Sequence, residues 1–203
     1  SELAAVLAHE AAHVTQRHIA RGLENQARTN LVSTAAMLAA ILIGAMAGGS
    51  SDATIGAVTA AQNLAIQSQI NFTREHEYEA DRVGIGLLHT AGFDPTSMAS
   101  FFDTMGRRTQ LGPDRVPELL RTHPVTSSRI AEARGRANQI GATVVAPDSL
   151  SYAITKERVR VLNTPAGVDP PAYYKSITEN EPDLSLAQVY GQALAQLMAG
   201  DAA

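Results

Sequence analysis

The spacing of apolar residues predicts a chain made of helices. Apolar residues recur at helical intervals from Leu3 to Leu23 without an intervening proline, which predicts one helix over residues 3–27. A second long helix is predicted from near residue 53 or 56 up to Gly92, a typical helix-ending residue. The fold class is therefore mainly α. Shorter helices are predicted over residues 95–107, 118–121, 127–140, 152–162, 173–177 and 184–200.

The stretch between the first two helices carries no charge. No Asp, Glu, Lys or Arg occurs over residues 29–51, and the glycine and serine cluster at 48–51 predicts a turn. The pattern predicts an apolar helical hairpin over residues 31–70. Three interpretations stay open: a buried pair of core helices, a hairpin that contacts a membrane or covers a site, and a true membrane span.

Length and composition set limits on domains and chemistry. The 203 residues suit one sizeable core with an appendage, and we expect a domain over residues 1–146 and a helical segment over 147–203. Because both ends of the chain fall in helical patterns, we expect sequence to be missing there. The absence of cysteine excludes disulfides and thiolate metal sites. A net charge of −4 offers no basic face for nucleic acid.

The first helix contains an HExxH motif, His9-Glu10-Ala11-Ala12-His13. Positions i and i+4 share one helix face, so His9 and His13 can bind one tetrahedral zinc ion. Glu10, beside the first histidine, can reach a water at the metal and serve as general base. The alternative is a helix with two surface histidines, which the small alanines around them argue against.

The third ligand that a catalytic zinc site needs must come from elsewhere. Glu77 and Asp81 also lie four residues apart and share a face. We expect Glu77 to bind the metal and Asp81 to accept the free N–H of His9, which fixes that ring. The alternative is a solvated acidic stripe paired with Arg74 and Arg82.

These motifs resemble those of gluzincin metallopeptidases, and in particular the family that contains the CAAX prenyl endopeptidase, HtpX and the BepA- and LoiP-type periplasmic peptidases. The matching segments are SELAAVLAHEAAHVTQRHIAR, INFTREHEYEADRVGIGLLHTAGFDP and LLRTHPVTSSRIAEAR. The resemblance implies a zincin-like helical domain with zinc held by His9, His13 and Glu77. It also implies Glu10 as the base and Asp81 as support for a ligand.

The resemblance carries further expectations about context. It implies a periplasmic endopeptidase that acts on envelope or outer-membrane proteins, in contact with a membrane-embedded assembly machine. It also implies that residues 186–203 begin a tetratricopeptide-like region, although one helix cannot show a repeat. The rival interpretations are a chaperone or scaffold with a latent or structural zinc site, and a helical adaptor without metal.

His123 has three open interpretations. In BepA-like members a histidine in a His-Pro loop can cap the zinc and keep the enzyme latent. His123 could instead hydrogen-bond a developing oxyanion, or make only a local contact at a helix end. Arg129 is predicted either to anchor this loop or to lie at the surface. His18, His76 and His89 fit no motif and are predicted to be structural or exposed.

The hairpin joins the two helices that carry the zinc ligands. We therefore expect residues 31–70 to lie beside the active site without crossing a bilayer.

Overall fold

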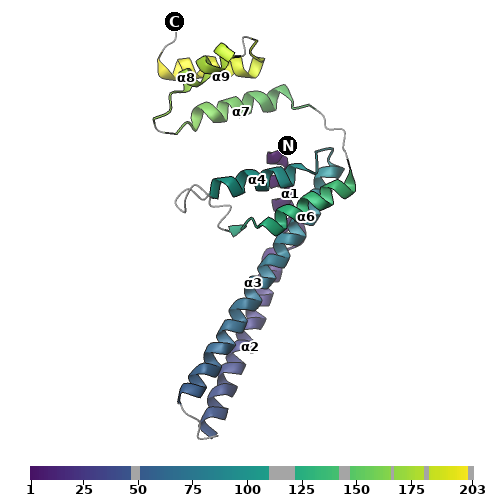
Figure 1. The fold of residues 1–203 in the computed structure, drawn as a ribbon, viewed down its shortest axis with the longest axis vertical. Helices are drawn as coiled ribbons and strands as arrows, with labels where there is room; N and C mark the ends of the chain where they lie inside the picture. The colour runs from purple at the N-terminus through teal and green to yellow at the C-terminus, as the bar shows by residue number, and fades with distance from the viewer. Residues whose placement is uncertain (47–50, 110–121, 142–146, 166, 181–182, 201–203) are drawn as a thin grey trace. The chain divides into compact units, whose positions relative to one another are not determined.

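The computed structural model describes all residues except 47–50, 110–121, 142–146, 166, 181–182 and 201–203. The described residues form helices and no strand, which confirms a mainly α fold (Figure 1). The short helix predicted at 118–121 lies outside the described residues. The helices are α1 (Glu2–Thr15), α2 (His18–Met46), α3 (Ser51–Thr90), α4 (Ser97–Thr109), α6 (Ser127–Ile140), α7 (Leu150–Leu162), α8 (Pro170–Asn180) and α9 (Leu186–Ala199).

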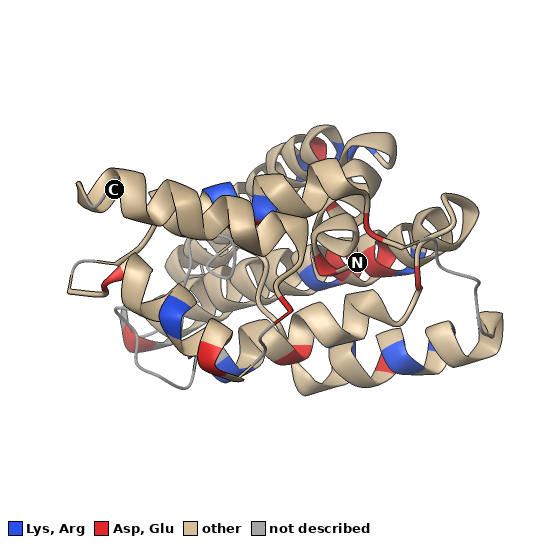
Figure 2. Ribbon diagram, turned by 90° about the horizontal axis from the view of Figure 1, so that it is seen from above, with Lys and Arg blue, Asp and Glu red and all other residues tan. Residues whose placement is uncertain are grey.

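The chain divides into two compact units, Ser1–Val145 and Ala146–Ala203. The division into functional domains stays a prediction. Figure 2 shows acidic and basic residues interspersed along the helices, with long stretches of ribbon that carry neither.

The predicted single helix over residues 3–27 is wrong. Helix α1 ends at Thr15 and α2 begins at His18. Between them Arg17 adopts φ 54°, a left-handed conformation that costs a non-glycine residue about 1–2 kcal/mol. Helices α1 and α2 pack along successive parts of α3 (Figure 1).

The predicted hairpin is present as the pair α2 and α3 (Figure 1). Helix α3 has 40 residues and is therefore about 60 Å long. Ile70 lies about 10 Å from Glu77 along this axis, whereas Asp52 lies almost 40 Å away. The base of the hairpin therefore borders the candidate site, whereas the rest of residues 31–70 extends away from it, which corrects the expectation that the hairpin lies beside the site.

The surface of the hairpin is apolar and exposed. His18 is the only residue of α2 that is buried, so the structure contradicts the buried-core interpretation within this chain. Among the described helices, α2 alone is long and apolar enough to cross a membrane, by length and composition. The interpretations as a membrane-contacting or membrane-spanning hairpin stay predictions. The large apolar side chains exposed on α2 are Ile19, Leu23, Leu31, Val32, Leu38, Ile41, Leu42, Ile43 and Met46.

The core of the first unit lies where α1, α3, α4 and α6 meet. Gly84 of α3 allows the close approach of α1, since a Cβ there would lie 3.2 Å from the backbone of Ala8. Helix α6 begins as predicted: the Thr126 hydroxyl accepts a hydrogen bond from the Arg129 backbone N–H at 3.2 Å. This packing holds the HExxH face of α1 against α3. The buried apolar residues are Ala5, Ile85, Leu88, Met98, Ala99, Phe102 and Ala133.

The second unit consists of α7, α8 and α9 around a small core. Tyr174 is fully buried there, and its hydroxyl donates a hydrogen bond to Glu157 Oε2 at 2.7 Å. Gly191 of α9 leaves room for this ring, because a Cβ would lie 2.3 Å from the Tyr174 hydroxyl oxygen. Three helices do not establish a repeat, so the tetratricopeptide-like assignment stays a prediction.

Candidate metal centre

Two histidines of α1 and a glutamate of α3 point their polar atoms at one another. The Nε2 atoms of His9 and His13 are 3.1 Å apart. Glu77 Oε2 lies 3.6 Å from His9 Nε2, and Glu77 Oε1 lies 3.4 Å from His13 Nε2. The structure thus brings together the three residues that the sequence nominated as ligands.

These separations fit a tetrahedral metal ion. Four ligands with bonds of about 2.0–2.1 Å to a tetrahedral ion lie about 3.3–3.4 Å from one another. The three measured separations bracket this value. His123 also offers an atom to the group, and the four ligand atoms all lie within 4.8 Å of one another. Two imidazoles and a carboxylate are a donor set that divalent transition metals accept.

Asp81 lies where support for a ligand is needed. Its Oδ1 atom is 2.9 Å from His9 Nδ1, on the side of the ring away from Glu77. His9 therefore has a carboxylate at each ring nitrogen. Burial alone would lower the pKa of His9, but Asp81 and Glu77 outweigh it and raise this pKa to about 9. A metal ion that binds here has to displace that proton.

The pKa values of the other two candidate ligands, His13 and Glu77, are both lowered. Burial, together with the charge of His9, lowers the pKa of His13 to about 4, so this ring is neutral. Burial would raise the pKa of Glu77. Hydrogen bonds from His123 and His9 and the charge of Arg129 hold it well below its usual range instead. Glu77 is thus a carboxylate, as a metal ligand must be.

Arg129 is the anchor of the site and not a surface residue. It is 3% exposed, and its Nε and Nη2 atoms donate to the two oxygens of Asp81 at 2.7 and 2.8 Å. Its Nη1 atom donates to the Pro124 carbonyl at 2.7 Å and lies 2.8 Å from Glu77 Oε2. The guanidinium also lies over the Phe102 ring, 4.7 Å from its centroid. The Arg129 guanidinium therefore links the Glu77 and Asp81 carboxylates to the loop that carries His123.

Glu10 lies beside the ligand group with a free oxygen. Its side chain is 43% exposed, yet its Oε1 atom is buried and has no hydrogen-bond partner among the described residues. This oxygen is 3.8 Å from His123 Nε2. A carboxylate oxygen that is desolvated and unpaired next to a metal site is available to accept a proton.

His123 belongs to the site, and its interpretation as a purely local helix-end contact is wrong. Its Nδ1 atom makes a hydrogen bond with Glu77 Oε1 at 2.8 Å, 46 positions away in the sequence. Its ring centroid lies 5.3 Å from that of His9 and 4.9 Å from that of His13. These positions are compatible with both remaining interpretations, the metal cap and the oxyanion donor.

The sequence did not predict the residues that contact His13 on the side of its ring away from Glu77. His18 is buried, and its Nδ1 atom lies 2.9 Å from His13 Nδ1. His18 Nε2 lies 3.2 Å from Glu79 Oε2, which also accepts a hydrogen bond from Arg21. On a straight helix, residues 13 and 18 point about 140° apart, so no periodic signal could pair them. The break at Arg17 brings them together.

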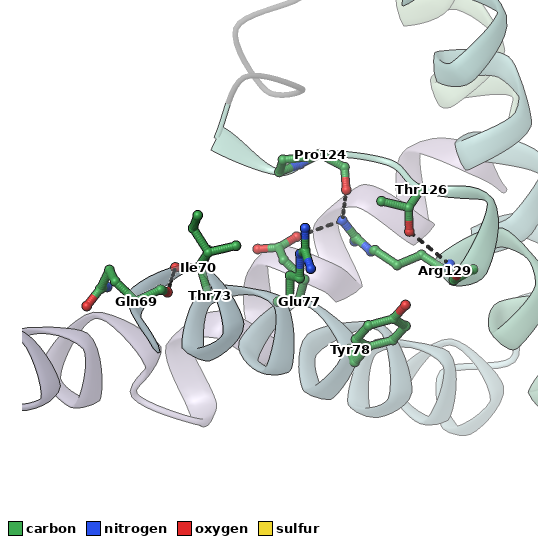
Figure 3. A pocket seen from close by; sticks show the side chains of 10 residues that line it. Gln69, Ile70, Thr73, Glu77, Tyr78, Pro124, Thr126 and Arg129 are labelled. Atoms are coloured by element: carbon green, nitrogen blue, oxygen red, sulfur yellow. Dashed lines mark hydrogen bonds and ion pairs between the residues drawn. The ribbon is translucent and has the colours of Figure 1, made fainter. Parts of the chain in front are cut away.

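A cleft opens beside the ligand group (Figure 3). Its volume is about 470 Å³, and Glu77 and Arg129 form part of its wall. Helix α3 supplies one side and the segment after His123 the other. The remaining lining residues are Gln69, Ile70, Thr73, Arg74, Tyr78, Pro124, Thr126 and Ser128.

The helical fold and this site define a metallopeptidase domain of the HExxH type. The chain belongs to peptidase family M48, whose family model matches residues 1–137. The residues that match the family model therefore include the candidate metal centre.

Relatives support the same assignment. The chain is 44% identical over 158 residues to the beta-barrel assembly-enhancing protease of Escherichia coli K12, covering 78% of this chain and 31% of the relative. It is 37% identical over 198 residues to the protein of the same name from Yersinia pestis, covering 96% and 39%. Metalloprotease LoiP of E. coli K12 is 29% identical over 141 residues, covering 70% and 51%. The chain thus spans well under half the length of the two assembly-enhancing proteases.

Proposed function

We propose that this chain is the catalytic part of a zinc-dependent endopeptidase. His9, His13 and Glu77 would hold a zinc ion, which when bound would polarise a scissile carbonyl and acidify water. Glu10 accepts the proton of the attacking water and returns it to the leaving amine. Asp81 and Arg129 hold His9 and Glu77 in place. The observation that carries the proposal is the desolvated, unpaired Glu10 oxygen beside three candidate ligand side chains whose polar atoms lie 3.1 to 3.6 Å apart.

The cleft suggests where a peptide binds. Its wall includes Glu77, so a substrate side chain in the cleft would flank the scissile bond at the metal. Ile70, Tyr78 and Pro124 give it an apolar lining suited to an apolar side chain. A volume of about 470 Å³ is large enough for any natural side chain.

The names of the relatives support a role in the cell envelope. Two of them are named beta-barrel assembly-enhancing proteases, so we propose outer-membrane proteins and their assembly machinery as substrates and partners, and the periplasm as location. The exposed apolar hairpin is a second feature that suits work at a membrane.

His123 gives this peptidase a candidate switch. If its imidazole takes the fourth metal position, water has no place there and Glu10 has no proton to accept. His123 already contacts Glu77 and faces both candidate histidine ligands, so it needs little movement to do so. We propose that it holds the enzyme latent until substrate or a partner moves its loop.

The test is Glu10→Gln, with Glu24→Gln on the exposed face of α2 as matched control. The Glu10 variant should keep its metal and fold but lose casein hydrolysis by about a hundred-fold or more, the usual contribution of a general base. The control should cleave casein at the wild-type rate. Undiminished cleavage by Glu10→Gln would refute the proposed role.

A further inference from the structure

A chain of polar contacts leads away from His13 on the side opposite the metal site. His13 Nδ1 lies 2.9 Å from His18 Nδ1. His18 Nε2 lies 3.2 Å from Glu79 Oε2, and Arg21 Nη1 donates to the same oxygen at 2.7 Å. This series of contacts joins the start of α2 to α3 and ends at Arg21, at the surface.

The hydrogens along this chain follow from the chemistry of neutral imidazole, which carries one N–H and one acceptor nitrogen. If His13 Nε2 faces a metal, its hydrogen is on Nδ1. Nδ1–H of His13 then donates to His18 Nδ1, which must be bare. The hydrogen of His18 is therefore on Nε2 and donates to the Glu79 carboxylate. This arrangement satisfies every contact with no extra proton.

The surroundings of His18 hold its ring in the plane in which it contacts both His13 and Glu79. His18 is 4% exposed. The ring of His76 stacks on it with centroids 4.2 Å apart and planes within 5° of each other. The Phe72 ring packs on His76 in turn, with ring centroids 4.1 Å apart. The left-handed Arg17 sets the starting direction of α2, which aims His18 back at α1.

We infer that His18, oriented by Glu79 and Arg21, is a positioning residue for the metal ligand His13. It does for His13 what Asp81 and Arg129 do for His9: it fixes the tautomer and the ring orientation. Outer contacts of this kind are worth about 10- to 100-fold in metal affinity. The inference rests on the proposed metal site and adds a second, independently anchored support to it.

The experiment measures zinc affinity by chelator competition. His18→Phe keeps a flat ring but no polar atom, and should weaken zinc binding by about 10- to 100-fold. His89→Phe is the matched control, because this histidine lies exposed near the end of α3, well beyond Glu77 and Asp81; it should stay within about twofold of wild type. His18→Asn places an acceptor close to the position of Nδ1 and should restore most of the affinity.

Two further results decide the inference. Glu79→Gln removes the acceptor charge at the end of the chain, keeps an oxygen in place, and should weaken zinc binding by a smaller factor than His18→Phe. If His18→Phe fails to fold by circular dichroism, the comparison of His18→Asn and Glu79→Gln with wild type decides. Wild-type affinity in His18→Phe, or equal losses in His18→Phe and His89→Phe, would overturn the inference while leaving the proposed peptidase intact. A wild-type chain that binds no zinc overturns both.

Discussion

Replacing Arg129 by methionine should destabilise the metal-free protein strongly. The guanidinium is buried and makes two hydrogen bonds to Asp81, one to the Pro124 carbonyl and an ion pair with Glu77. Methionine fills similar space but leaves two buried carboxylates without their cation. Breaking a buried ion pair on one side costs about 3–5 kcal/mol, and we expect the free energy of unfolding to fall by that amount.

The assay is urea unfolding followed by circular dichroism in the presence of a chelator. Arg134→Met is the matched control: Arg134 is 57% exposed and pairs with Asp103 at the surface, so its loss should cost at most about 1 kcal/mol. Arg129→Lys keeps the charge but cannot grip both Asp81 oxygens, and should fall between the two. A loss in Arg129→Met no larger than in Arg134→Met would refute the reasoning.

The same variant has a predicted pH dependence. The folded-state pKa of Glu77 lies below its ordinary value of 4.5, so the stability from this carboxylate is present above pH 4.5 and is lost as the pH falls below it. A protonated carboxyl needs no cation. The difference between wild type and Arg129→Met should therefore shrink below pH 4.5, and a constant difference down to acid pH would contradict the electrostatic account.

Three further predictions address the switch, the cleft and the second unit. His123→Ala should raise basal casein cleavage, self-cleavage included; a fall of about a hundred-fold would make His123 an oxyanion donor, and no change would exclude both roles. Ile70→Trp should fill part of the cleft and shift cleavage of a peptide library towards small side chains, and an unchanged preference would remove the cleft from the substrate path. Burial and the hydrogen bond to Glu157 raise the pKa of Tyr174 above its ordinary 10.0, so this contact stabilises below pH 10 and is lost as the pH rises beyond it. The stability difference between wild type and Tyr174→Phe, from thermal melts at pH 8 to 11, should therefore narrow above pH 10, and a difference that widens would contradict this.

The sequence predicted the parts of the site that depend on helical periodicity alone. His9 and His13, and Glu77 and Asp81, are both four residues apart, so a helix must place each pair on one face. The need of a catalytic zinc site for a third ligand joined the two pairs, and the family resemblance implied the same set; no periodic argument could do so. The result is the ligand group that the structure assembles.

The parts that the sequence missed depend on tertiary structure. An arginine does not signal a left-handed conformation. The break after Thr15, and the position of His18 beside His13, could therefore not be predicted from the sequence. For Arg129 the sequence left two interpretations open, an anchor of the His123 loop and a surface residue, and only the packing of the folded chain shows that it is buried. The apolar stretch of α2 predicted a hairpin correctly, but its exposure depends on how far α3 extends past the core.

The central claim is a metal ion held by His9, His13 and Glu77 with Glu10 beside it and not bound to it. Counting zinc per chain by mass spectrometry in wild type, His9→Ala and Glu10→Gln tests this most directly. The account predicts one zinc per chain in wild type and Glu10→Gln, and almost none in His9→Ala. Full zinc retention in His9→Ala, or loss of zinc in Glu10→Gln, would contradict it.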